Sequence, residues 1–275
     1  MNRVDRSTAH RPEPTGLRWI ATAVLRTWAG SLAEAWSNRR GFCVQVWAMV
    51  ANDAVWVLFW LFLFRRFESI RGWEVQDIVV LQAVPTTAGG FVLGLLANSR
   101  LIGQAIADGR LDAALGLPIP TLPYLLARRI DVTFIGDIIF GVGLFFILAD
   151  PTPIRLAIFV TTAVASAAMI VGFLVLIGST AFFLGRSEVG DLSFQALLLF
   201  ASYPVDLFGS RARFLLYAVI PAGFVSGVPV RLLSNFDWRW AVAMAAVATG
   251  LMTAAVVVFN RGLRQYTSGS VWTGA

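Results

Sequence analysis

The sequence contains no lysine, a single cysteine and a single histidine. Without lysine it has no Walker A phosphate loop, because that pattern requires a lysine before a serine or threonine. Cys43 has no partner for an internal disulfide, and His10 and Cys43 are too few and too far apart to form a cluster typical of zinc sites. We therefore expect no metal site, no catalytic site and no ATP-hydrolysing site in this chain.

Charge is also scarce. Charged residues make up 14% of the 275 residues and hydrophobic residues 57%, whereas a soluble domain carries roughly a quarter charged residues. The mean hydropathy is +0.73. All 22 basic residues are arginines, and they flank apolar runs instead of forming one patch. This placement is typical of membrane proteins and argues against nucleic-acid binding.

Apolar runs of the length needed to cross a bilayer, roughly 20 residues, recur along the chain. We expect an all-α membrane protein with six transmembrane helices and no cleaved signal peptide after the polar leader at 1–16. The six spans are expected in one domain over 41–268, before a tail at 269–275. They are placed at about 41–64, 75–97, 130–149, 156–184, 192–208 and 240–259.

Two further segments have membrane character without the pattern of a simple span. Residues 17–40 have an apolar stripe at helical spacing, with Trp28 and Trp36 on it and Arg26 off it, which predicts an amphipathic helix at the membrane surface. Residues 204–237 are apolar but interrupted by proline and glycine. We expect re-entrant helices there, and the alternative is a seventh span over about 214–230.

Arginine distribution orients the expected spans. With the N-terminus inside, 14 of the 22 arginines fall on the cytoplasmic side and 8 outside. This bias agrees with the excess of positive charge in cytoplasmic loops. We expect a multi-pass protein of a bacterial inner membrane with both termini in the cytoplasm.

The segment between the second and third spans, 98–129, is polar and is expected in the cytoplasm. Leu111 and Leu115 share a helix face, and Gly109 permits a turn before them. The segment is either an ordinary solvated loop or a contact site. In a contact site, its small apolar surface, flanked by charged residues, would fit a cleft in a soluble partner. The residues of this candidate contact are Asp108, Gly109, Arg110, Leu111, Asp112, Leu115 and Pro118.

Four motifs in this order resemble the six-span permeases of the type 2 ABC exporters, a family once grouped as a domain of unknown function. They are 109–118, Tyr203–Pro204, Ile220–Pro221 with a further proline at 229, and 259–268. The resemblance covers nearly the whole chain, from the amphipathic helix to Ser268. One departure is visible, since the family pattern often has a basic residue before the loop proline and this chain has Leu117.

The resemblance implies partners and an architecture. Two permeases, identical or related, would pair in the bilayer, and two copies of a separate ATPase, which carries ATP and magnesium, would dock beneath them. The 98–129 segment would be the coupling helix, and 204–237 would re-enter from the outer side. The function implied is the membrane-spanning subunit of an ATP-driven exporter.

Two carboxylates fall inside expected spans: Asp53, beside Asn52, and Asp137. An ionisable residue within a membrane span is costly and usually faces a bundle interior or an aqueous path. We expect Asn52, Asp53 and Asp137 to line a translocation path. The alternative function is an ion-coupled secondary transporter that uses Asp53 and Asp137.

Overall fold

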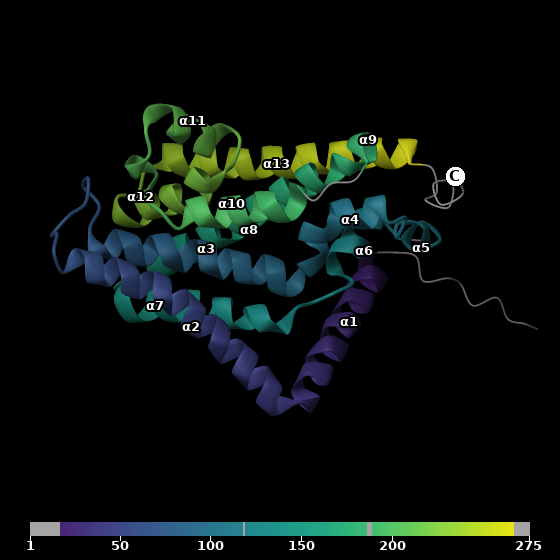
Figure 1. The fold of residues 1–275 in the computed structure, drawn as a ribbon, viewed down its shortest axis with the longest axis horizontal. Coiled ribbons are helices and arrows are strands. Elements are labelled where there is room, and N and C mark those ends of the chain that lie inside the picture. The colour runs from purple at the N-terminus through teal and green to yellow at the C-terminus, as the bar shows by residue number, and fades with distance from the viewer. Residues whose placement is uncertain (1–16, 118, 186–188, 267–275) are drawn as a thin grey trace, which may run out of the picture.

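The structure, a computed structural model, describes residues 17–117, 119–185 and 189–266 (Figure 1). The described residues are helices and connections, without strands beyond one isolated bridge between Ile70 and Trp73. The expected all-α fold is therefore confirmed. The leader at 1–16 and the tail at 269–275 lie outside the described residues.

Four helices are long and apolar enough to cross a membrane by themselves. The central one, α3, is buried along most of its length, whereas α2 and α13 present most of their residues to the outside of the bundle. In Figure 1, α3, α8 and α13 run roughly along the long axis of the molecule, whereas α2 lies oblique to them. Their bounds are α2 Arg39–Phe64, α3 Val75–Leu95, α8 Pro153–Ser179 continued by α9 Ala181–Leu184, and α13 Trp238–Gln265.

Two pairs of shorter helices bring the number of candidate spans to as many as six. Helix α6 (Thr121–Ala127) is bent by 70° from Val132–Leu148, which comprises η2 (Val132–Phe134) and α7 (Ile135–Leu148). Helix α11 (Ser210–Ala218) is bent by 85° from Gly223–Ser234, which comprises η4 (Gly223–Gly227) and α12 (Val228–Ser234). The described chain is therefore a multi-pass membrane fold, as predicted.

The 85° bend confirms that the segment before the last helix is broken. Pro221 lies in the break and has no N–H to donate to a continuing helix. Helix α12 is buried against the bundle, whereas Phe214 and Leu215 of α11 remain exposed. A straight seventh span over 214–230 is therefore not what the chain forms.

The fifth expected span is shorter than predicted. Helix α10 covers Val189–Ala201, 13 residues, which is about 20 Å of helix against about 30 Å of hydrocarbon. The chain turns before Pro204, which disfavours helical backbone in the residue that precedes it, and continues as the short helix η3 (Val205–Leu207). Helix α10 thus reaches only part of the way along the bundle.

The N-terminal helix α1 (Leu17–Ser37) is separate from α2 and lies across the bundle direction in Figure 1. The break falls at Asn38, whose side-chain oxygen accepts a hydrogen bond from the backbone N–H of Gly41 at 3.1 Å. Trp28 Nε1 donates to the carbonyl oxygen of Ala127 at 3.1 Å, which fixes α1 to α6. The helix predicted for this segment is thus present and attached to the segment between α3 and α7, and its location at the membrane surface stays a prediction.

At the opposite end, one carboxylate joins the α2–α3 connection to the broken segment. Asp206 accepts a hydrogen bond from Trp73 Nε1 at 3.1 Å and forms an ion pair with Arg213 at 3.2 Å. Its backbone carbonyl accepts from Arg71 Nη1 at 2.8 Å. These contacts hold η3 and α11 over the end of α3.

Candidate functional site

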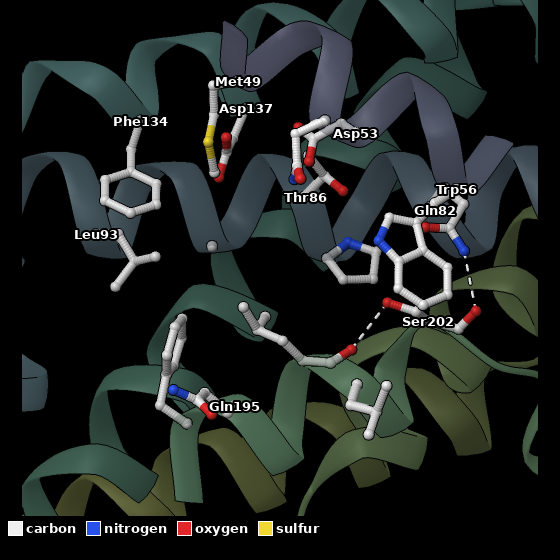
Figure 2. A pocket seen from close by; sticks show the side chains of 16 residues that line it. Met49, Asp53, Trp56, Gln82, Thr86, Leu93, Phe134, Asp137, Gln195 and Ser202 are labelled. Carbon is white, nitrogen blue, oxygen red and sulfur yellow. Dashed lines mark hydrogen bonds between the residues drawn. The ribbon is translucent and has the colours of Figure 1, made fainter. Parts of the chain in front are cut away.

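A cavity of about 390 Å³, lined by both polar and apolar residues, lies between α2, α3, α7 and α10 (Figure 2). Asp53 lies near the middle of α2, so the cavity lies well inside the candidate spans. Its polar lining residues come from all four helices and the turn after α10. They are Asn52, Asp53, Gln82, Thr86, Asp137, Gln195 and Ser202, beside Met49, Trp56, Pro85, Gly89, Leu93, Phe134, Phe194, Leu198 and Leu199.

Close helix packing puts Asp137 in the cavity. Gly136 lies against α2 so closely that a Cβ there would be 2.6 Å from the carbonyl oxygen of Val46. On the other side of α7, a Cβ at Gly90 of α3 would be 2.9 Å from the Cβ of Asp137. Glycine permits each of these close contacts because it has no Cβ. The two glycines therefore allow the start of α7 to pack closely against both α2 and α3.

Helix α3 forms the wall opposite α2 and α7. Its Pro85 lines the cavity and cannot donate to the carbonyl of Leu81, which lies one turn earlier. Gln82 is 6% exposed, and its Nε2 donates to the carbonyl oxygen of Ser202 at 3.0 Å. This hydrogen bond joins α3 to the turn after α10, and both residues line the cavity.

The two carboxyl groups lie close enough to interact directly. Asp137 is 6% exposed. Among the described residues, neither Asp137 Oδ1 nor Asp53 Oδ2 has a hydrogen-bond partner, although both atoms are buried. None of the arginines that the structure describes lines the cavity. Two adjoining carboxyls with unpartnered oxygens therefore make this region favourable for positive charge.

The structure brings together the three residues that the sequence placed on a path, Asn52, Asp53 and Asp137. Their assignment to a translocation path stays a prediction. Sequence reasoning did not include Gln82, Thr86 and Gln195, although each is a polar residue inside an expected apolar span. The contrast between each polar side chain and the apolar residues around it in the sequence could have identified these three as candidate site residues.

The 108–117 segment begins after helix α4 (Ile102–Ala107). Gly109 has φ +69°, the turn conformation expected of it. Arg110 Nη2 and Asp108 Oδ2 form an exposed ion pair at 2.9 Å, and Asp112 begins the short helix α5 (Asp112–Leu115). Pro118 lies outside the described residues.

The two leucines of this segment have different surroundings. Leu111 is 0% exposed and packs in the core of this chain, whereas Leu115 is 46% and Leu117 37% exposed. The expected pair of Leu111 and Leu115 as one exposed knob is therefore wrong. Helix α5 has only four residues, and Leu111, which precedes it, packs inward.

The base of the segment is firmly packed on the long helices. Asn98 Nδ2, in η1 (Ala97–Leu101), donates to the carbonyl oxygen of Leu125 at 2.8 Å, which joins the two sides of the connection. Ile102 packs against Gly178 of α8, where an added Cβ would lie 3.0 Å from Ile102 Cβ. This close approach joins the base of the segment to α8.

Metal binding by His, Cys, Asp and Glu has no support in the described residues, since no three of them come together in a way that could hold an ion. The cavity offers two carboxyls and neutral polar groups. This arrangement can bind and orient a polar or charged solute inside the bundle.

Comparison with known proteins gives one match. The family model described as ABC-2 family transporter protein matches residues 50–270, from within α2 to beyond α13. No curated protein and no solved structure matches the chain. The matched range includes all the lining residues of the cavity except Met49, as well as the 108–117 segment and the broken helices before α13. With most of its length covered, the chain belongs to the ABC-2 family of ABC transporter membrane proteins.

Proposed function

We propose that this chain is the membrane-spanning permease of an ATP-driven exporter and is moved by a separate ATPase that docks on the 108–117 segment. The observation that carries the proposal is this segment. It presents Leu115, Leu117 and the Asp108–Arg110 pair to the outside while Leu111 anchors it in the core. An exposed apolar contact inside a polar rim is the usual composition of a binding hot spot.

The internal cavity supplies the other half of the proposal. Asn52, Asp53 and Asp137 would line the path of the solute, and helix α8 packs against both α4, at the base of the 108–117 segment, and α3, which lines the cavity. ATP and magnesium would be bound by two ATPase copies, and a second permease, identical or related, would complete the assembly. Export is proposed from the resemblance to type 2 exporters.

The proposal also gives an orientation in a bacterial inner membrane. Both chain ends and the 108–117 segment would face the cytoplasm, and the Asp206 contacts would face outward. In a Cys43→Ser background, Gly116→Cys should be labelled by a membrane-impermeant maleimide only after the cells are opened, whereas Glu68→Cys should be labelled on intact cells. Both positions are exposed. Labelling of Gly116→Cys on intact cells would reject this orientation.

The function is tested by purification together with the ABC ATPase encoded nearest to this chain. We expect the ATPase to remain bound through affinity purification and size-exclusion chromatography and the complex to hydrolyse ATP in a vanadate-sensitive way. The chain purified alone should hydrolyse none, because it has no lysine for a phosphate loop.

The same experiment addresses the alternative, an ion-coupled secondary transporter that uses Asp53 and Asp137. The two unpartnered carboxyl oxygens are the observation in its favour. Such a transporter works without an ATPase. If no ABC ATPase binds the chain, the exporter proposal fails and the ion-coupled mechanism becomes the better account.

A further inference from the structure

We infer that the cavity between α2, α3, α7 and α10 binds a small organic cation with an apolar body, and that Asp53 and Asp137 together recognise its positive charge. This inference rests on the proposed transport function and names the class of solute. It depends on the charge, the unpartnered atoms and the apolar lining of the cavity.

The charge balance of the cavity points to a cation. Two carboxyls line it, and its lining includes no arginine, while Gln82 and Ser202 are already joined by a hydrogen bond. Asp137 is more than nine-tenths buried, and its Oδ1 lacks a partner among the described residues. A carboxylate in this position is strongly destabilised unless a positive group approaches it.

The rest of the lining favours an organic cation over a bare metal ion. Trp56, Phe134 and Phe194 contribute aromatic surface, and Met49 and Leu198 contribute aliphatic surface. Aromatic faces attract cations that are weakly hydrated, such as quaternary ammonium and phosphonium groups. A volume of about 390 Å³ lies within the range of pockets that hold small organic ligands.

Aromatic contacts also fix the shape of the cavity on the α2 side. Trp56 packs edge-on against Tyr203, with ring centroids 5.8 Å apart, and Tyr203 packs in the same manner on Trp60 at 5.9 Å. Figure 2 shows the Trp56 ring between the carboxyl pair and Ser202. In the same view Phe134 lies on the other side of the carboxyl pair. Carboxyl groups with aromatic neighbours suit a solute with a charged head and an apolar body.

Equilibrium binding to the purified full chain in lipid nanodiscs, without ATPase and without ATP, tests the inference. The probe is radiolabelled tetraphenylphosphonium, and the matched control ligand is tetraphenylborate, which has the same shape and the opposite charge. We expect saturable binding of the cation above that of empty nanodiscs and no saturable binding of the anion. Each of Asp53→Asn and Asp137→Asn should weaken cation binding at least tenfold, and the double variant should abolish it.

Asp150→Asn is the matched control, because it removes the same charge from an exposed position beyond the end of α7. It should bind the cation as the unmodified chain does. The asparagine variants are first required to elute as a single species in size-exclusion chromatography, and asparagine has nearly the shape of aspartate.

Three results would overturn the inference. They are no saturable cation binding by the unmodified chain, equal binding of the borate, or unchanged binding by the double variant. The first includes the case in which the two carboxyls hold only a proton or an inorganic ion. Because the measurement omits the ATPase, its failure is distinct from failure of the docking experiment.

Discussion

Replacing Leu115 and Leu117 together with aspartate should separate the chain from its ATPase and leave the fold of the chain intact. Both side chains are partly exposed, 46% and 37%, so the new carboxylates meet water in the free permease. In the proposed complex the same positions are covered by the partner. The substitution therefore acts on docking and not on folding.

The expected loss of affinity is large. Burying the remaining surface of each leucine contributes on the order of 1 kcal/mol, and an unpaired carboxylate in a covered contact costs more. The sum corresponds to a binding constant weaker by at least ~100-fold. The ATPase should no longer copurify, and ATP hydrolysis by the mixture should no longer respond to the permease.

The control makes the same chemical change elsewhere. Phe236→Asp replaces an apolar side chain that is 60% exposed at the opposite end of the bundle, and the complex should persist. Leu111→Asp is unsuitable as a docking test, because Leu111 is 0% exposed and the charge would disrupt the core. Retention of the ATPase by the Leu115→Asp, Leu117→Asp double variant would show that the 108–117 segment is only a solvated connection.

Gly136→Val should displace α7 and destroy the cavity. The first added atom would lie 2.6 Å from the carbonyl oxygen of Val46 and 2.7 Å from Met49 Cβ. Neither the α2 backbone nor a Cβ can rotate away, so the helices must separate. Overpacking of this kind costs about 1–3 kcal/mol and occasionally more, and the backbone contact places this site at the upper end.

Thermal unfolding in detergent, followed by size-exclusion chromatography of heated samples, measures the effect. We expect the Gly136→Val variant to melt several degrees lower and to lose the cation binding assigned to the cavity. Gly143→Val is the control on the same helix, because a Cβ at Gly143 would have no heavy atom within 4 Å. Equal melting of the two variants would show that α7 does not depend on the close approach at Gly136.

The sequence by itself determined the class of this protein. With 57% hydrophobic and 14% charged residues, the chain has too few charged residues to cover the surface of a typical soluble domain. Its apolar runs are long enough to cross a bilayer as helices. The missing lysine excluded a Walker A phosphate loop from this sequence. Proline and glycine positions predicted the broken segment before the last helix, because both act on the local backbone.

Tertiary structure decided which polar residues meet. Asp53 and Asp137 lie on different helices, and close approaches such as those at Gly136 and Gly90 bring α7 against α2 and α3. Gln82 of α3 lines the same cavity and donates a hydrogen bond to the carbonyl oxygen of Ser202, in the turn after α10. Leu111 and Leu115 are alike in sequence but not in burial, because burial depends on which neighbours the fold supplies. Local pattern sets helix and span, whereas the site depends on contacts between helices that sequence spacing does not encode.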